Sequence, residues 1–587
     1  MPKSNRSRRR EGRWSAWRRA PFGESAFAAG GNQLSCRSRI GISPRDDCLA
    51  RLHSYISAMR FSIASTILLF VTATALAIAA PVSAQGYICA EGGGGPSGGS
   101  WAPAVFGWMV DRAEDGGGTS KVIVLGLSGT DPAITTAFNA AGATSVTFLN
   151  VTSANANSAA TFNAITAADI VWMRGGDQWQ YILQWNNTQT EAAIRNVYQA
   201  GGVVGGTSAG CAVLGELIYD AKVGSVTPKQ ALQNATHPFL TFTDTFLQLT
   251  PGVLFDTHFT ERGRVGRLAV MLANRWQVTG RDVLGVGVDD RTALCVYPDL
   301  TAEVRGEGAV TFLHRTSSSV KRVESGKSPV VTHLSLTQLT EGYVYDLTTR
   351  SVIERPASAT LPPPSTISPS VTVPVTLNGS TVSSPQQGDV RVLDFNNDLA
   401  LFLGKLDVVD GNNTLQRVVL SAQTWNSTAF DENRVGGPQY AIALNPHYFG
   451  LYLDGNTLVN ATPPSLLTAQ SPASGLESAI VAFDSHGMTS LDFSNYVSDP
   501  GDSDGPRQSV AIEGARLHLF RNSWGYRLDL HRPVSPAGAS DINLDGTIDA
   551  ADMAILLGQW GLSGTADLDG SGTVDGADLS QLLGSWS

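Results

Sequence analysis

A serine, a histidine and a pair of aspartates stand at separate points of the chain, in settings that suit nucleophilic catalysis. Ser208 is the centre of Gly206-Thr207-Ser208-Ala209-Gly210, a G-x-S-x-G sequence between an apolar segment and a helical one. His258 lies on a loop before another expected helix, and Asp289 and Asp290 end an apolar strand. A serine becomes a nucleophile when a base accepts its proton and a third group orients that base. The residues therefore predict a triad of Ser208, His258 and either Asp289 or Asp290.

The spacing of the serine pentapeptide has a steric reason. A serine on a sharp strand-to-helix turn needs small neighbours two positions away on either side, so that strand and helix can approach each other. Gly206 and Gly210 meet this need. The hydroxyl then lies at a helix N-terminus, where backbone N–H groups can stabilise an oxyanion. A glycine-rich corner without chemistry is the competing interpretation, but the apolar and helical flanks favour a nucleophile.

The elements around these residues alternate between strand and helix over residues 86–356. Apolar segments predict strands at 121–126, 144–151, 168–174 and 202–205, and a fifth strand that ends at Asp289 and Asp290. Helices are expected between them at 133–141, 179–185 and 190–200. This alternation predicts an α/β domain with a parallel sheet that helices cover on both faces. Sites in such sheets form at the carboxyl ends of strands, where Gly175-Gly176 and the serine turn both lie.

Charge and composition indicate an exported protein. The first 58 residues carry 12 Lys/Arg against 4 Asp/Glu and are either a basic leader or sequence upstream of the true start. Residues 59–84 have a basic start, an apolar run and a small-residue end, which is typical of a cleaved signal peptide, with an uncleaved anchor as the alternative. Beyond residue 84 the net charge is −19, so we expect no nucleic-acid partner. The chain beyond residue 84 has three cysteines, Cys89, Cys211 and Cys295. An odd number of cysteines rules out a complete disulfide framework.

Four motifs in a fixed order provide a specific resemblance. Gly175-Gly176-Asp177-Gln178, the serine pentapeptide, a D-x-H-F-x-x-R-x-R stretch and a G-V-G-V-D-D-x-T-A strand resemble the cyanophycinase family of serine peptidases. This family is related to aspartyl dipeptidase and has a class I glutamine-amidotransferase-like (flavodoxin-like) fold. The resemblance spans residues 85–356 and implies Ser208 as nucleophile, His258 as base and Asp290 as acid, where the family usually has Glu. It also implies an oxyanion hole formed by the N–H groups of Gly176 and Ala209. The substrate pocket that it implies is lined by Gln178, Asp256, Arg262, Arg264 and Arg267.

The chemistry implied by the resemblance is hydrolysis of β-aspartyl-arginine units of cyanophycin to dipeptides, with no cofactor for catalysis. Guanidinium groups bind carboxylates in a bidentate manner, although arginines at i, i+2 and i+5 cannot all share one helical face. Thr257 stands where the family usually has Gln, so an α-aspartyl dipeptidase-like activity is an alternative. A non-catalytic surface-binding protein on the same fold is an alternative from another class. Whether the catalytic domain forms a dimer is left open.

A Pro/Ser/Thr-rich linker is expected over residues 357–370, followed by an all-β accessory domain over 371–536. Short segments between Asn, Gly and Asp turns predict strands at 389–395, 399–406, 440–444, 449–453 and 516–530, and these favour a β-sandwich. Trp425, Tyr448, Trp524 and Tyr526 either bind a polymer or glycan or fill the core, and the sequence does not decide between these roles.

The last part of the chain, residues 541–587, contains two acidic loops of the same spacing. Oxygen-bearing residues occupy positions 1, 3, 5, 7, 9 and 12 of each loop, with Gly at position 6, as a Ca²⁺ loop requires. They are Asp541, Asn543, Asp545, Thr547, Asp549 and Asp552, and then Asp567, Asp569, Ser571, Thr573, Asp575 and Asp578. Short helices are expected at 553–560 and 579–586. Asp at position 12 resembles the duplicated half-motif of dockerins, which implies bound Ca²⁺ and a cohesin-type partner, whereas a disordered acidic tail would not explain two matched loops.

Overall fold

The computed structural model describes residues 86–96, 101–115, 118–362, 375–378, 402–406, 418–422, 449–453, 458–462, 466–471, 479–492, 494, 496–497, 507–508, 510–528 and 530–586. The expected leader and signal peptide lie outside these residues, as do 363–370 of the linker, the expected strands at 389–395 and 440–444, Trp425 and Tyr448. Within the described part, no helix combines the length and the apolarity needed to cross a membrane.

The first sheet carries the serine turn and has the order β15-β14-β11-β10-β1-β5-β4-β2-β3. Its parallel strands are β1 (Tyr87–Glu91), β5 (Val203–Thr207), β4 (Ile170–Met173), β2 (Lys121–Gly126) and β3 (Ser145–Asn150). An antiparallel extension consists of β10 (Thr292–Val296), β11 (Thr301–Gly306), β14 (Val344–Asp346) and β15 (Ser351–Glu354). The predicted α/β class of this region is confirmed, although the sheet is mixed rather than wholly parallel.

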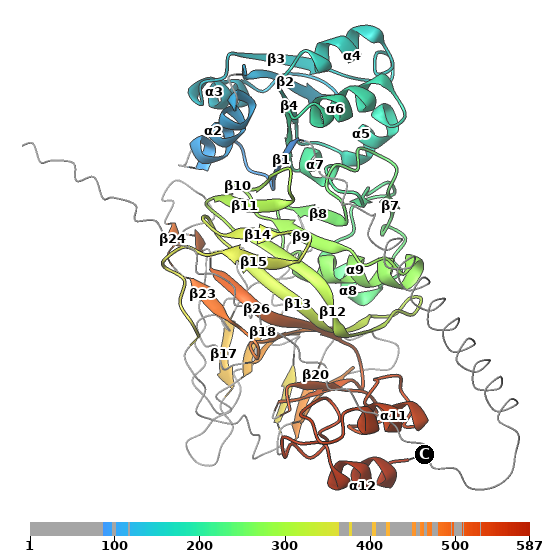
Figure 1. Ribbon diagram of the computed structural model, residues 1–587. Coiled ribbons are helices and arrows are strands. Elements are labelled where there is room, and N and C mark those ends of the chain that lie inside the picture. The colour runs from blue at the N-terminus through green and yellow to red at the C-terminus, as the bar shows by residue number, and fades with distance from the viewer. Residues whose placement is uncertain are drawn as a thin grey trace, which may run out of the picture. The chain divides into compact units, whose positions relative to one another are not determined.

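Helices lie on both faces of this sheet (Figure 1). One face packs against α2 (Trp101–Glu114) and α3 (Pro132–Ala140) and forms a first core. The other face packs against α5 (Gln178–Trp185), α6 (Gln189–Gln199) and α7 (Ala209–Ala212) and forms a second core, to which α4 (Ala159–Thr166) contributes Ile165. Val203 belongs to the first core and its neighbour Val204 to the second. The two valines separate because successive side chains of a strand point to opposite faces.

A second sheet joins residues 85–356 to the C-terminal part of the chain, in the order β17-β18-β19-β22-β26-β13-β12-β9-β8 with β23 paired to β26. Residues 85–356 supply β8 (Val253–Thr257), β9 (Leu284–Val288), β12 (Val310–Arg322) and β13 (Val330–Leu339). The expected accessory region supplies β17 (Phe402–Leu406), β18 (Val418–Ala422), β19 (Phe449–Leu453), β22 (Ile480–Asp484), β23 (Ser490–Asp492) and β26 (Ala511–Phe520). The strand before Asp289 therefore lies in this second sheet, which corrects the expectation of a single parallel sheet.

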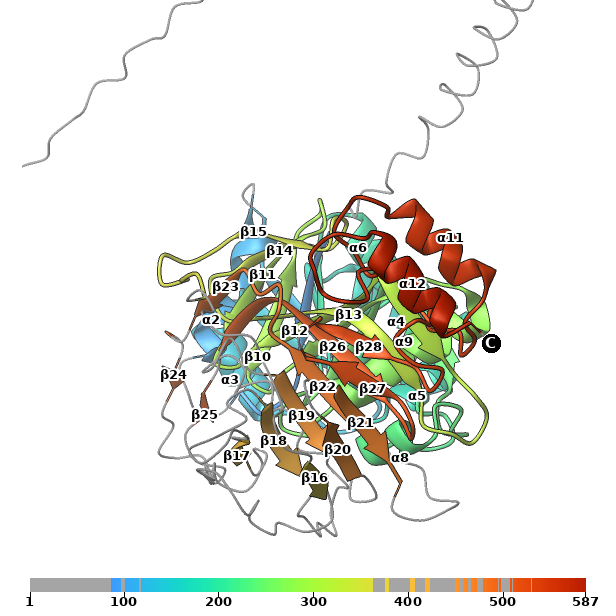
Figure 2. The ribbon, with the colours of Figure 1, turned by 90° about the horizontal axis from the view of Figure 1, so that it is seen from below.

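The junction between the two regions is a shared core as well as a shared sheet. Strand β13 pairs antiparallel with β26 from Val331 opposite Leu519 to Gln338 opposite Ile512, and the two strands run side by side in Figure 2. Helix α9 (Val265–Thr279), which follows the histidine loop, packs in the same apolar cluster as β26. The segments on either side of the expected linker thus pack together.

The remaining C-terminal strands form a separate sheet and a hairpin. The five-stranded sheet contains β16 (Val375–Asn378), β20 (Leu458–Thr462), β21 (Leu466–Gln470), β27 (Gly525–Arg527) and β28 (Arg532–Val534), and β24 (Tyr496–Val497) pairs with β25 (Arg507–Gln508). The single strand expected at 516–530 is in fact divided between β26 and β27, because the chain turns between them at Ser523, where φ is 68°. Trp524 and Tyr526 are both buried, so these two aromatic residues fill the core.

Each acidic loop leads into a helix, α11 (Ala550–Gly558) in the first case and α12 (Gly576–Gly584) in the second. Both helices begin before the expected residue, because Asp549 and Asp575 cap them and form capping boxes with Asp552 and Asp578. Arg322 of β12 donates a hydrogen bond to the Leu544 carbonyl of the first loop at 2.6 Å. The C-terminal module therefore contacts the second sheet directly.

Candidate active site

Ser208 occupies a sharp turn between β5 and α7. Its backbone has φ 53° and ψ −112°, a conformation that residues with a side chain rarely adopt. A Cβ on Gly206 would lie 2.6 Å from the Gly210 carbonyl carbon, and a Cβ on Gly210 would lie 2.2 Å from the Met173 carbonyl oxygen. Only glycine fits at these two positions, for the steric reason inferred from the pentapeptide.

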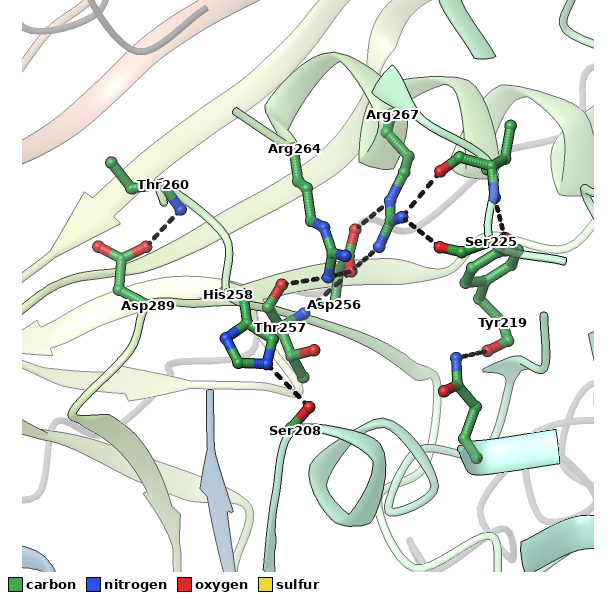
Figure 3. Close-up of polar contacts among 12 residues, drawn as sticks. Ser208, Tyr219, Ser225, Asp256, Thr257, His258, Thr260, Arg264, Arg267 and Asp289 are labelled. Carbon is green, nitrogen blue, oxygen red and sulfur yellow. Dashed lines mark hydrogen bonds and ion pairs between the residues drawn. The ribbon is translucent and has the colours of Figure 1, made fainter. Parts of the chain in front are cut away.

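The structure brings the three predicted residues together. His258 Nε2 lies 2.8 Å from Ser208 Oγ, as Figure 3 shows, and His258 Nδ1 lies 2.5 Å from Asp290 Oδ1. The contact with the carboxylate on one side of the ring leaves Nε2 facing the serine hydroxyl, where it can accept the serine proton. The histidine follows β8 and the aspartate follows β9, so the base and the acid come from the second sheet while the nucleophile comes from the first.

Asp289, the other candidate acid, supports the backbone. Its Oδ1 accepts a hydrogen bond from Thr260 N at 2.9 Å (Figure 3), and its Oδ2 accepts one from Ala309 N at 3.0 Å. The side chain is buried and connects the loop after His258 to the start of β12. Of the two aspartates that the sequence left open, the geometry favours Asp290 as the partner of His258.

A pocket of about 310 Å³ opens beside Ser208. Its lining includes every residue that the resemblance placed around the serine, namely Gly176, Gln178, Ala209, Asp256, Arg262, Arg264 and Arg267. Ala209 is the first residue of α7, so its N–H lies at a helix N-terminus, as an oxyanion hole requires. Three arginines and two aspartates line the pocket, and this surplus of positive charge suits an anionic substrate.

Two of the three arginines bind Asp256 at the floor of the pocket (Figure 3). Arg267 Nε donates to Asp256 Oδ2 at 3.0 Å, and Arg264 Nη1 lies 3.3 Å from Oδ1. Burial alone would raise the pKa of Asp256, but the guanidiniums of Arg267 and Arg264 outweigh burial and hold this pKa below its ordinary value. Arg264 and Arg267 thus neutralise a buried carboxylate, whatever else they contact.

The helical-face argument for the arginines does not apply, because it holds for a regular helix and the stretch is not one. Helix α9 begins at Val265, so Arg262 and Arg264 precede it and only Arg267 lies within it. Thr257, the departure from the family pattern, is buried next to the same cluster, and its N–H donates to Asp256 Oδ1 at 2.9 Å. Thr257 therefore lies among the residues that hold Asp256.

A segment that the sequence analysis missed, residues 91–94, runs along the whole triad. Ser208 N donates to Glu91 O at 3.1 Å, and His258 N donates to Gly92 O at 3.0 Å. Gly93 has φ +151°, and a Cβ on it would lie 2.2 Å from His258 Cε1 and 2.3 Å from Asp290 Oδ1. The run of four glycines after Glu91 was the available signal, since glycine is needed where a backbone passes this close to side chains.

Comparisons with known proteins match part of this chain to peptidases. Residues 127–302 match the model of peptidase family S51. Cyanophycinase of Synechococcus elongatus is 31% identical over 186 residues, which cover 31% of this chain and 54% of that protein. Cyanophycinase of Trichormus variabilis is 29% identical over 194 residues, which cover 32% of this chain and 61% of that protein. The matched part of the chain is thus cyanophycinase-like, and the chain spans between about half and three fifths of the length of these relatives.

Among solved structures, a peptidase from an acI-B1 actinobacterium matches with 17% sequence identity and a TM-score of 0.33. The match covers 45% of this chain and 98% of the chain of that peptidase. That score is too low to carry a structural argument. The family match and the curated relatives, together with the triad, support a serine-type peptidase.

Proposed function

We propose that this protein is a serine peptidase that hydrolyses cyanophycin or related aspartyl peptides. One observation carries the proposal: Ser208 Oγ, His258 Nε2 and Asp290 Oδ1 form a connected relay, with contacts of 2.8 Å at Nε2 and 2.5 Å at Nδ1. The relay stands at a pocket rich in arginine. The relatives named cyanophycinase support the choice of substrate class.

The proposed reaction is acyl transfer through the serine. Ser208 Oγ attacks the scissile carbonyl while its proton moves to His258 Nε2, and Asp290 stabilises the resulting imidazolium. The N–H groups of Gly176 and Ala209 receive the oxyanion. The C–N bond then breaks as His258 returns the proton to the leaving amine, and water, activated by the same histidine, hydrolyses the acyl-enzyme.

The pocket chemistry suits a substrate that carries carboxylates. In cyanophycin both aspartate carboxyls are in amide bonds, so the free carboxylates near the scissile bond are those of the attached arginines. Arg262 lines the pocket just before α9 begins and could bind such a carboxylate through two parallel hydrogen bonds. Arg264 and Arg267 are buried against Asp256, whereas Arg262 is only half-buried. We therefore assign the main substrate contact to Arg262.

The test is to incubate the full chain with cyanophycin and to identify the products by mass spectrometry, with Ser208→Ala as the inactive control. We expect β-aspartyl-arginine dipeptides from the native protein alone. Products from α-aspartyl dipeptides, without products from cyanophycin, would favour the dipeptidase-like alternative. If a fluorophosphonate probe fails to label Ser208, the protein is a non-catalytic binding protein.

We also propose that the two C-terminal loops bind Ca²⁺. In the second loop, carboxylate oxygens of Asp567, Asp569 and Asp578 all lie within 4.8 Å of one another, which fits an oxygen-ligated cation. The first carboxylate of each loop also holds its loop in the same way: Asp541 accepts from Gly546 N at 2.7 Å, and Asp567 accepts from Gly572 N at 2.8 Å. Ca²⁺ would offset the charge gathered in each loop.

A docking role for this module has support from its surface. Each half of the module exposes two large apolar side chains, with between 40% and 54% of their surface exposed. They are Leu557 and Trp560 after the first loop, and Leu583 and Trp586 after the second. Exposed apolar groups of this kind suit a protein partner, and we propose a cohesin-type protein. We further propose export through residues 59–84, which rests on the sequence alone.

Calorimetric titration of the full chain with Ca²⁺ tests the metal proposal, with Asp567→Ala/Asp569→Ala as the matched variant. We expect the native chain to bind Ca²⁺ at two sites and the variant at one. Equal heats from the two proteins would exclude the second loop as a site.

A further inference from the structure

We propose that Glu91 is a positioning residue for the triad, whose buried side chain and backbone hold the serine, histidine and aspartate segments in one geometry. The inference rests on the proposed function, because it concerns the same nucleophile. Glu91 lies outside residues 127–302, the region that matches the family model.

The place of Glu91 in the first sheet brings it between two catalytic segments. It is the last residue of β1, and its partners in the neighbouring strands are Thr207 of β5 and Ala293 of β10. Thr207 directly precedes the nucleophile, and β10 begins shortly after Asp290. Glu91 is only 1% exposed, so its carboxyl lies inside the protein beneath the triad.

Glu91 is linked, directly or through Gly93, to a neighbour of each catalytic segment. Its Oε1 accepts a hydrogen bond from Gly93 N at 2.9 Å, and the Thr207 hydroxyl also hydrogen-bonds to the carboxyl. Thr207 is adjacent to Ser208, the Gly93 backbone lies against both His258 and Asp290, and Gly93 O accepts the N–H of Arg291, the neighbour of Asp290. Glu91 therefore connects, directly or through Gly93, three segments that are far apart in the sequence.

The backbone of the same segment completes these connections. Glu91 O accepts from Ser208 N at 3.1 Å, Gly92 O accepts from His258 N at 3.0 Å, and Gly93 O accepts from Arg291 N at 2.7 Å. Because Gly93 leaves no space for a side chain beside His258, a shift of this segment would move the imidazole. The carboxyl bond to Gly93 N acts together with these backbone bonds to hold the segment in this path.

The charge state of Glu91 suits this role. Burial raises the pKa of Glu91 well above its ordinary value, more than the hydrogen bonds from Thr207 and Gly93 lower it, and the charge of Asp290 raises it further. Burial raises the pKa of the Cys89 and Cys211 thiols, and the charge of this carboxyl raises it further. A neutral side chain at position 91 would add no second negative charge beside Asp290, and glutamine is the neutral substitute closest to glutamate in shape and hydrogen bonding.

The experiment compares Glu91→Gln, Glu91→Leu and Glu91→Asp with Glu191→Gln as the matched control. Glu191 is a buried carboxylate of α6 that bonds to Asn187 N at 2.6 Å and to Arg195 at 3.0 Å. Three quantities are measured for each variant: the rate at which a fluorophosphonate labels Ser208, kcat and KM separately, and the melting temperature.

We expect Glu91→Leu to lower the labelling rate and kcat by about 100-fold, the size of effect that follows small misplacements of catalytic groups, while KM stays within about twofold. Glu91→Gln should keep a labelling rate within about threefold of the native one, since it retains the bond to Gly93 N. Glu91→Asp keeps the acid but shortens the reach, so it should resemble Glu91→Leu. Glu191→Gln should lower the melting temperature and leave the labelling rate unchanged.

The labelling rate separates this inference from the proposed function. A native protein that labels at Ser208 but cleaves no aspartyl peptide would overturn the proposed substrate, while the labelling rates of the Glu91 variants still test positioning. Labelling of Glu91→Leu and Glu91→Asp at the native rate would overturn the positioning role. If Glu91→Leu does not fold, a native labelling rate in Glu91→Asp alone overturns it.

Discussion

Replacing Ser208 by glycine should abolish activity and yet give a more stable protein than replacing it by alanine, because the serine backbone is strained. Ser208 has φ 53° and ψ −112°, and a residue with a Cβ in such a conformation costs about 1–3 kcal/mol. Glycine adopts this conformation without that penalty. Alanine keeps the Cβ and hence the strain, so the pair Ser208→Gly and Ser208→Ala isolates the backbone contribution.

The magnitude follows from three contributions. Both variants lose the hydrogen bond between the serine hydroxyl and His258 Nε2, which is worth about 1 kcal/mol and cancels in the comparison. Glycine relieves about 1–3 kcal/mol of strain, and its greater freedom in the unfolded chain offsets about 0.4–1 kcal/mol of that gain. We therefore expect the free energy of unfolding of Ser208→Gly to exceed that of Ser208→Ala by about 1 kcal/mol.

The assay is denaturant unfolding of the two variants, with Ser225→Gly and Ser225→Ala as the matched pair. Ser225 lines the same pocket but is not among the described residues with positive φ, so glycine should be the less stable of that pair. Neither Ser208 variant should hydrolyse substrate or react with a fluorophosphonate. A Ser208→Gly variant that is less stable than Ser208→Ala would refute the strain argument.

Three further predictions concern charged groups. Asp290→Asn should lower kcat by about 10⁴-fold, as loss of the orienting acid does in such triads. Asp289→Asn should mainly lower the melting temperature, because Asp289 accepts backbone hydrogen bonds. Steady-state kinetics and thermal unfolding distinguish the two variants. Arg267→Ala should destabilise the fold by about 3–5 kcal/mol because Asp256 would lose its partner in a buried site, while Arg262→Ala should raise KM with little change in denaturant midpoint; equal thermal effects at both positions would contradict the assignment. Burial lowers the pKa of His333 to about 4 and also lowers that of His518 at the junction of β13 and β26, near Asp484 and Arg516. Because these histidines bind protons more readily when unfolded, their contribution to stability should be complete above about pH 6.5 and lost as the pH falls toward 4, so the denaturant midpoint should drop between pH 7.5 and 5, and less so in His333→Gln.

Much of the site was predictable because its requirements are local. The steric need for Gly206 and Gly210 acts between residues two positions from the serine, so the pentapeptide together with its apolar and helical flanks predicts the serine turn and its strained backbone. Apolar periodicity located β2 and α5 to within a few residues, because each pattern reflects one element against one core. The prediction of two Ca²⁺ loops is local in the same sense, since the oxygen-bearing residues proposed as ligands of each site lie within a single short loop.

The tertiary structure decided whatever depends on pairing between distant segments. Asp289 and Asp290 are neighbours of the same residue type, and successive residues of an extended chain point to opposite sides. Only the packing of the end of β9 against the start of β12 and the histidine loop directs Asp289 to backbone N–H groups and Asp290 to His258. The role of Glu91 and the pairing of β13 with β26 likewise arise between residues far apart in the chain. No local pattern encodes such contacts, because each is formed only when the two sheets assemble.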